Sequence, residues 1–316
     1  MTDILQDSNI NFAFKANQAL PMLIEYREAV WKSHCTYVLN NLLIPYFEKN
    51  KFSVVNQCNQ VCVLIENRIN SQWLFTLLNT IIMSPANTGI CLIMDKENQE
   101  KARSLLTQNN LFLDLIWIST DQINSSINLK ETSSFNKLMK SYRLWDKLPH
   151  ERILIIQTDA LLSEPLPKYF FNFEYLGAPF LPKKNSEYFE NLSNNGEIIN
   201  FFKVDTPIHG SPNKDVYPHL YGNGGLSIRN KSLMKEICCK YSLSSSTDEQ
   251  EDVFFSRHLK EFCNPVPIQI AKAFAFETSY EKSSIGCHAP WKYLTSSELG
   301  EYLDKHLRKV WSILIQ

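Results

Sequence analysis

The first half of the chain carries four short, continuous apolar runs rich in Ile, Val and Leu. They are VCVLIE (61–66), GICLIM (89–94), LFLDLIWI (111–118) and RILIIQ (152–157). Runs of this kind are typical of parallel strands, because helices cover both faces of the sheet and neither face meets water. The runs therefore predict four parallel β-strands.

Between the runs, apolar residues recur at helical spacing. SQWLFTLLNTIIM (71–83) has an apolar stripe with Ser71 as its expected N-cap, and residues 97–108 and 133–146 can also form helices. Strands that alternate with helices indicate βαβ units. We therefore predict an α/β, Rossmann-like fold: a mostly parallel sheet flanked by helices at residues 59–316, with an N-terminal helical extension at residues 1–58.

Composition changes this picture little. The 316 residues are 44% hydrophobic, and 32 basic against 33 acidic residues give a formal net charge of −1. A balanced charge does not steer a protein toward nucleic acid or an anionic membrane, so we expect no nucleic-acid partner. The eight cysteines lie mostly in apolar runs, which indicates a reducing compartment. With no signal-like start and no apolar run long enough to span a membrane, we expect a soluble, cytoplasmic protein.

A carboxylate follows the fourth predicted strand directly. In ILIIQTDALL (153–162), Gln157, Thr158 and Asp159 interrupt the apolar residues. Asp at a strand end is common in turns, and that explanation stays open. Ligands of α/β sheets, however, bind beyond the carboxyl ends of the strands, where Asp159 is expected.

Three later segments also carry candidate chemistry. YGNGGLSIR (221–229) has three glycines around Asn223, so its backbone can approach a ligand closely; it can equally be a glycine-rich turn before a strand. TDEQEDVFFSRHL (247–259) places Glu251 and Asp252 in the first turn of a predicted helix, capped by Thr247 and Gln250. Acidic residues are favoured there by the helix dipole alone, but a carboxylate held in place can also act as a general base.

The third segment is IGCHAPWKYL (285–294). His288 lies in an apparently irregular stretch between Gly286 and Pro290, where its imidazole could bind a divalent metal, and Lys292 could meet a phosphate. Together with Asp159 and the acidic pair, these residues are what is needed to hold a diphosphate through a cation while a carboxylate deprotonates a hydroxyl.

The order of these motifs resembles the glycosyltransferases of the GT-A fold, and in particular a poorly characterised family of bacterial and viral glycosyltransferases. The shared features are Q-x-D-A (157–160), Y-x-G-A-P (175–179), G-N-G-G-x-S-x-R (222–229), E-D-x-F (251–254) and a G-x-H-x-P-W-like segment (286–291). The resemblance covers roughly residues 60–293 and implies a GT-A-like catalytic domain at residues 59–316.

The resemblance implies roles for individual residues. Asp252 would be the general base of an inverting transfer, with Glu251 as second choice, and Asp159 with His288 would hold a manganese or magnesium ion. The sequence departs from the family pattern at Gln157, which stands where the first Asp of the Asp-x-Asp motif is expected, so metal-independent binding stays open. The residues expected to bind the donor are Glu66, Arg68, Asp95, Gln157, Thr158, Asp159, Asn223, Gly224, Gly225 and Lys292.

The implied substrates are a nucleotide-sugar donor, UDP- or GDP-linked, and a glycan or other hydroxyl-bearing acceptor. The protein would then work in the cytoplasm, at the periphery of membrane glycan assembly, or in association with a virus. Two alternatives remain. One is a non-catalytic GT-A-like module that binds a nucleotide sugar or a partner. The other is a sugar-phosphate nucleotidylyltransferase, although ENRINSQ (66–72) lacks the Gly-rich basic loop of that class.

Overall fold

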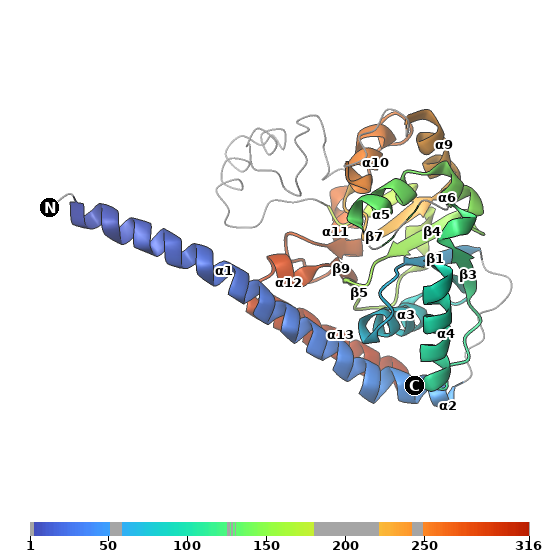
Figure 1. Ribbon diagram of the computed structural model, residues 1–316, viewed down its shortest axis with the longest axis horizontal. Coiled ribbons are helices and arrows are strands. Elements are labelled where there is room, and N and C mark those ends of the chain that lie inside the picture. The colour runs from blue at the N-terminus through green and yellow to red at the C-terminus, as the bar shows by residue number, and fades with distance from the viewer. Residues whose placement is uncertain are drawn as a thin grey trace.

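A six-stranded sheet forms the centre of the computed structural model, which describes residues 3–50, 59–124, 127, 129, 131–179, 221–241 and 249–315 (Figure 1). Its strands are β1 (Gln60–Ile65), β2 (Thr88–Met94), β3 (Ile116–Ser119), β4 (Arg152–Ile156), β6 (Tyr175–Gly177) and β7 (Leu226–Asn230). Their order in the sheet is β3-β2-β1-β4-β7-β6. The predicted fold class, a mostly parallel sheet flanked by helices with a helical N-terminal part, is confirmed.

The direction of β7 determines what meets at one edge of the sheet. Strands β1, β2, β3 and β4 run parallel, whereas β7 is antiparallel to β4 and to β6. The carboxyl ends of β1 and β4 therefore lie at the same edge as the beginning of β7. The residues that follow Ile65 and Ile156 meet there with the glycines that precede Leu226.

Both faces of the sheet are buried. Along β1, Cys62 and Leu64 belong to one apolar core, and Val61, Val63 and Ile65 belong to the other. The first core contains residues of the N-terminal helices, α3 (Ser71–Met83), α4 (Lys96–Gln108), α11 (Ile268–Phe274), α12 (Pro290–Tyr293) and α13 (Ser296–Leu314). The second contains residues of α5 (Thr132–Met139), α6 (Tyr142–Lys147), α9 (Lys231–Tyr241) and α10 (Glu251–Leu259). The strands are continuous apolar runs because both faces of the sheet are covered and neither meets water.

A small second sheet has the order β5-β9-β8 and extends the structure beyond the end of β4. It consists of β5 (Ala160–Leu162), β8 (Ala275–Phe276) and β9 (Gly286–His288). Strand β9 is antiparallel to β5 and parallel to β8. The chain thus leaves β4, makes one turn over Gln157–Asp159, and enters a second set of strand pairings.

Three sequence-based expectations differ from the structure in detail. Only residues 116–118 of the run 111–118 belong to β3, because this edge strand pairs with β2 alone and Phe112 is 80% exposed. The helix predicted at 133–146 is split into α5 and α6 at Ser141, which is extended, while Trp145 Nε1 donates to Met139 O at 2.9 Å. The N-cap of α3 is Asn70, which accepts from Trp73 N, and not Ser71.

Some expectations fall outside the described residues. Thr247 of the predicted capping box is among them. The seven cysteines that the structure describes are all free. Within the described part of the chain, no helix has the length and apolar character needed to cross a membrane.

The N-terminal part is a helix, α1 (Asp3–Val38), followed by a π-helical turn, η1 (Leu39–Leu43), and α2 (Ile44–Lys49). Helix α1 runs along α13, and its N-terminal end projects away from the sheet (Figure 1). Its buried residues join the first core: the Trp31 ring lies 5.0 Å from that of Trp291, and Arg27 donates to Leu294 O. The domain boundary at residue 58 stays a prediction.

A chain of neutral imidazoles links α1, α13 and α3, and it should make the fold sensitive to acid. His34 Nε2 lies 2.8 Å from His306 Nδ1, and His306 Nε2 lies 2.9 Å from Asn79 Oδ1. Burial lowers the pKa of His34 to about 4 and also lowers the pKa of His306. The unfolded chain takes up these protons near the ordinary pKa of 6.5, so the stability is complete above that pH and is lost as the pH falls toward 4.

Urea unfolding at about pH 7.5 and about pH 5.5 measures this effect. Proton uptake by His34 of the unfolded chain should alone make the free energy of unfolding about 1 kcal/mol lower at the lower pH than at the higher pH. His34→Gln, which keeps a polar side chain beside His306, should lose that part of the pH dependence. If His34→Gln keeps the full pH dependence of the native protein, neutral burial of the pair is contradicted.

Candidate active site

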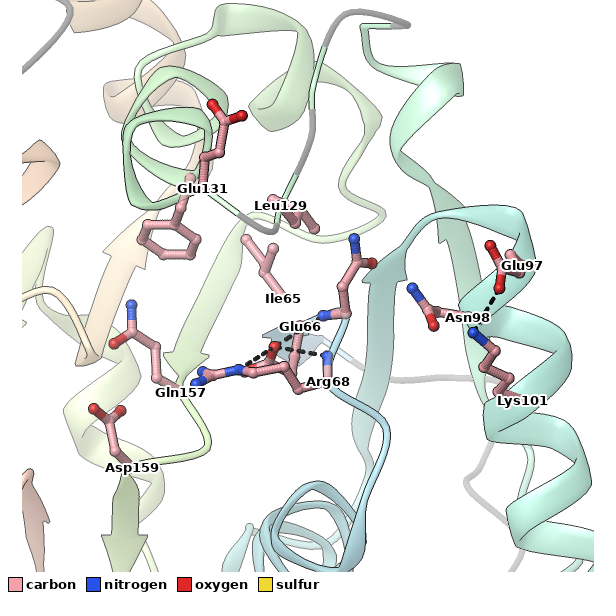
Figure 2. Close-up of a pocket in the computed structure, with 12 residues that line it drawn as sticks. Ile65, Glu66, Arg68, Glu97, Asn98, Lys101, Leu129, Glu131, Gln157 and Asp159 are labelled. Carbon is pink, nitrogen blue, oxygen red and sulfur yellow. Dashed lines mark hydrogen bonds and ion pairs between the residues drawn. The ribbon is translucent and has the colours of Figure 1, made fainter.

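A cavity of about 650 Å³ opens at the carboxyl ends of β1 and β4. It is lined by Ile65, Glu66, Asn67, Arg68, Glu97, Asn98, Lys101, Leu129, Glu131, Phe135, Gln157 and Asp159. Figure 2 shows Gln157 and Asp159 on one side of this space, the Glu97–Lys101 pair on the other, and Arg68 between them. Four of the predicted donor-binding residues, Glu66, Arg68, Gln157 and Asp159, thus line one cavity.

Glu66 closes the turn after β1. Its Oε1 accepts from Arg68 N at 2.8 Å and from Arg68 Nε at 2.9 Å, and its Oε2 accepts from Thr158 Oγ1 at 3.0 Å. Thr158 is buried, and its hydroxyl group links the segment after β4 to Glu66 after β1. The Arg68 side chain is 77% exposed. The hydrogen bond to Glu66 raises the pKa of Arg68 most, and the charge of Asp159 adds to this.

Asp95 lies apart from the lining of this cavity. It is the N-cap of α4: Oδ1 accepts from Asn98 N at 2.9 Å, and Oδ2 accepts from Asn67 Nδ2 at 2.9 Å. Asp95 N in turn donates to Asn67 Oδ1. The carboxylate thus fixes the start of α4 and orients Asn67, which does line the cavity.

Strand pairing brings His288 against Asp159. Ala160 of β5 pairs with His288 of β9, and Ala289 N donates to Asp159 O at 2.9 Å. His288 Nε2 consequently lies 3.2 Å from Asp159 Oδ1. His288 was expected in an irregular segment; it is buried at the end of a strand, because its backbone completes the second sheet.

The two side chains alter each other's protonation. Burial alone would raise the pKa of Asp159, but the charge and hydrogen bond of His288, together with the charge of Lys292, outweigh it and lower the pKa to about 2. Burial alone would lower the pKa of His288, but Asp159 and Glu277 outweigh it and raise the pKa to about 10. With protein groups alone around it, the imidazole is positively charged at neutral pH.

The glycine segment before β7 fits closely around this pair. Gln157 N donates to Gly225 O at 2.8 Å. A Cβ at Gly225 would lie 2.4 Å from His288 Nε2 and 2.9 Å from Gln157 Oε1, and one at Gly224 would lie 1.8 Å from Glu251 Oε1. Glycine is required at both positions because the backbone runs directly against the side chains of Glu251, His288 and Gln157.

The donor atoms at this point fit a divalent cation. Gln157 Oε1 and Asp159 Oδ1 each lie 3.2 Å from His288 Nε2, and Gly225 leaves the space beside them free of a side chain. A carboxylate, an amide oxygen and an imidazole nitrogen are ligands that Mn²⁺ or Mg²⁺ accepts. Among the described residues no three His, Cys, Asp or Glu side chains surround one point, so the third donor here is the amide of Gln157.

Asp252 lies on the other side of the glycine segment. Its Oδ2 accepts from Gly224 N at 3.3 Å, and its Oδ1 accepts from Val253 N at 2.8 Å. Burial, followed by the negative charges of Glu251 and Glu277, raises the pKa of Asp252 to about 7. A carboxyl group with this pKa can give up and take back a proton near neutral pH.

Glu251 has a different environment from its neighbour. Its two oxygens accept from Arg229 Nη1 at 2.6 Å and from Arg229 Nη2 at 2.9 Å, and both side chains are buried. The Arg229 guanidinium also lies 4.9 Å from the centre of the Tyr175 ring and 5.1 Å from that of Phe255. Glu251 is therefore committed to an ion pair, which leaves Asp252 as the acidic residue suited to proton transfer.

Two residues of this region carried no role in the sequence-based assignment. Arg229 was quoted only as the end of a motif, and Glu277 was not singled out. Glu277 Oε1 lies 3.0 Å from His288 Nδ1 and 3.3 Å from Asn223 Nδ2. A sequence signal existed: Glu277 follows the apolar run AFAF (273–276) as Asp159 follows β4, and a carboxylate after a short strand deserves the same attention.

The remaining predicted residues lie near the same place. Asn223 is buried, and its Oδ1 accepts from Gly225 N at 2.6 Å. Lys292 is exposed on α12, close enough to Asp159 to lower the pKa of that carboxyl. The described cavity reaches Asp159 but not Asp252; the two are joined through His288, Glu277, Asn223 and the glycine segment.

The model of the family described as "Protein of unknown function (DUF5672)" matches residues 118–288, from the end of β3 to His288. No curated protein matches the sequence significantly.

The similar solved structures include glycosyltransferases. The apo-form glycosyltransferase GlyE of Streptococcus pneumoniae TIGR4 is 12% identical over 81% of this chain and 62% of its own, with a TM-score of 0.44. Apo mouse xyloside xylosyltransferase 1 is 12% identical over 65% of this chain and 82% of its own, with a TM-score of 0.37. The inositol-1-phosphate CTP transferase from T. maritima is 10% identical over 79% and 96%, with a TM-score of 0.36. This chain thus spans less than two thirds of the length of GlyE.

Proposed function

This chain belongs to the family described as "Protein of unknown function (DUF5672)", and we propose that it is a glycosyltransferase. It would move a sugar from a UDP- or GDP-linked donor to a hydroxyl group of a glycan or another acceptor, with inversion at the anomeric carbon. Asp252 would be the general base. The donor would occupy the cavity at the ends of β1 and β4, and the acceptor would approach from the Asp252 side of the glycine segment.

The proposal rests on the difference between the environments of two acidic residues of α10, Glu251 and Asp252. Asp252 has its pKa raised to about 7, and Glu251 beside it is held in a buried ion pair. A general base works best when its pKa lies near the operating pH. Carboxyl groups with a pKa perturbed in this way are candidates for catalysis on that physical ground.

The cavity suits a nucleotide in size and position. Its volume of about 650 Å³ lies in the range of small-molecule sites, roughly 300–1,000 Å³. It lies at the carboxyl ends of parallel strands, where α/β sheets bind ligands. Arg68 and Lys101 supply positive charge within it, and Lys292 lies close to Asp159. We propose that Glu66, Thr158 and Asp95 act by fixing the backbone around the nucleotide.

We propose Mn²⁺ or Mg²⁺ as the cofactor, held by Asp159, His288 and the amide oxygen of Gln157. When bound, such a cation neutralises charge on the diphosphate of the donor. Gln157 in place of a second carboxylate leaves the site more positive, which favours an anionic ligand over the ion alone. Mg²⁺ sites with one or two carboxylates and substrate phosphates have this character.

In the transfer step, Asp252 would accept the proton of the acceptor hydroxyl as the oxygen bonds to the anomeric carbon and the bond to the diphosphate breaks. General-base assistance of this kind contributes about 10²–10⁴-fold in rate. Arg68 and Lys292 would stabilise the charge that develops on the departing nucleoside diphosphate. The buried Arg229–Glu251 pair would keep α10, and with it Asp252, against Gly224.

Release of nucleoside diphosphate from a panel of sugar nucleotides tests the proposal. We expect one or a few donors to be hydrolysed or transferred above background in the presence of Mn²⁺, and Asp159→Asn to lower that rate by at least about tenfold, because it removes the charged ligand. Asp304→Asn, on the outer face of α13, is the matched control and should have no effect.

The competing function, a module that binds without catalysis, predicts a different result. Nucleotide binding would be measurable by calorimetry, while release stayed at background with every donor. That outcome would overturn the transferase proposal and leave the binding site in place. The replacement of the first expected acid by Gln157 is the feature that favours this alternative.

A further inference from the structure

Glu277 is a buried carboxylate whose charge helps raise the pKa of Asp252 but which has no direct part in the transfer step described above. It follows β8, and its side chain is 2% exposed. Its Oε1 lies 3.0 Å from His288 Nδ1 and 3.3 Å from Asn223 Nδ2. A buried carboxylate costs free energy unless polar partners compensate it, so its position between these two side chains calls for a function.

The contact with Glu277 fixes the orientation of the His288 ring. With Nδ1–H donated to Glu277 Oε1, the other nitrogen, Nε2, is the one that faces Gln157 Oε1 and Asp159 Oδ1. A ring flip would lose the bond to Glu277. Metal-binding histidines are usually held in this way, by a carboxylate that accepts from the nitrogen opposite the metal and makes the ligand more basic.

Glu277 also reaches the glycine segment through Asn223. Asn223 Nδ2 faces Glu277 Oε1, while Asn223 Oδ1 accepts from Gly225 N at 2.6 Å. The adjacent Gly224 N donates to Asp252 Oδ2. One carboxylate thus contacts the side chain that orients the loop as well as the imidazole that faces Asp159.

We propose that Glu277 is the positioning residue of a divalent-cation site, where it orients His288 so that Nε2, Gln157 Oε1 and Asp159 Oδ1 can bind one ion together with the diphosphate of a nucleotide. The proposal rests on the cation site of the proposed function. It adds a residue that itself contacts neither the ion nor the nucleotide. Removing its carboxylate should therefore weaken ion binding without removing a ligand.

Mn²⁺ binding in the presence of uridine diphosphate tests this role directly, by electron paramagnetic resonance of free and bound ion. Glu277→Ala should weaken Mn²⁺ binding by about 10–100-fold, as loss of such a supporting carboxylate usually does. Glu277→Gln keeps an oxygen that can accept from Nδ1–H, so it should recover part of the affinity. Glu281→Gln, a half-buried carboxylate four residues on that accepts from Ser283 Oγ, should match the native protein.

The outcomes separate this inference from the function beneath it. If Glu277→Ala and Glu277→Gln are both folded and bind Mn²⁺ as well as the native protein, the positioning role is overturned and the cation site stands. If Asp159→Asn binds Mn²⁺ as well as the native protein, the cation site itself is in the wrong place, and the inference fails with it. A loss in Glu277→Ala that Glu277→Gln does not reduce at all would indicate that charge, and not orientation, is responsible, which also overturns the proposal. Sugar transfer is measured separately by nucleoside diphosphate release.

Discussion

Asp252→Asn should lower the rate of sugar transfer by about 10²–10⁴-fold, which is the usual contribution of a general base. The Asn side chain has nearly the same shape, but its one oxygen can accept from Gly224 N or from Val253 N and not from both. It also cannot take the proton of the acceptor. Substrate binding should change little. The measurement is kcat and KM for release of nucleoside diphosphate with the donor identified from the panel, and the loss should lie in kcat.

The same substitution should leave the fold as stable as before or make it more stable. Burial and the charges of Glu251 and Glu277 raise the pKa of Asp252 to about 7, so its ionised form is unfavourable in the folded chain. A raised pKa means that the group favours folding at low pH and opposes it as the pH rises through 7. Neutral Asn removes that cost, and urea unfolding at about pH 8 should show an equal or higher midpoint.

The pH dependence of sugar transfer by the native protein provides a second measurement. Asp252 acts as a base only when ionised, so the rate should increase with pH up to about 7 and then level off. A variant Asp252→Asn that keeps its activity within about threefold, or a native profile without a step near neutral pH, would exclude Asp252 as the base.

The sequence predicts the sheet well for a physical reason. Strands covered on both faces need apolar side chains at every position, and β1, β2 and β4 accordingly stand within a residue of their predicted bounds. The apolar pattern predicts the bounds of the edge strand β3 less well, because this strand pairs with β2 alone. The break between α5 and α6 depends on the Trp145 indole bonding to a carbonyl, which periodicity does not reveal.

The residues of the candidate site were likewise predicted only in part. Residues at strand ends and in the glycine segment were found because topology brings the ends of parallel strands to one edge. The choice of Asp252 over Glu251 came from the resemblance to inverting GT-A enzymes. In the structure the two residues differ because Arg229 of β7, which lies 22 residues before Glu251, pairs with Glu251. Glu277 was missed because its partners, His288 and Asn223, are joined to it only by tertiary structure.

Arg229→Met should destabilise the fold by about 3–5 kcal/mol, which is the usual cost of leaving one member of a buried ion pair without its partner. Glu251 is only 4% exposed and lies against Gly224, so its carboxylate would be left buried without its partner. Lysine should not rescue the site, because it lacks the planar fork that bonds both oxygens of Glu251 and Ser227 Oγ at once. Urea unfolding gives the free energy of each variant.

The double variant Arg229→Met/Glu251→Gln separates an unpaired charge from lost packing. If the charge is the main cost, the second substitution should restore a large part of the stability, since no ionised group is left buried, and the two changes should be strongly non-additive. Arg308→Ala is the matched control: its partner Asp304 lies at 2.7 Å, but the two side chains are 78% and 56% exposed, so the loss should be at most about 1 kcal/mol. A loss for Arg229→Met no larger than that of the control would mean that the pair does not hold α10 in place, and the position of Asp252 would need another explanation.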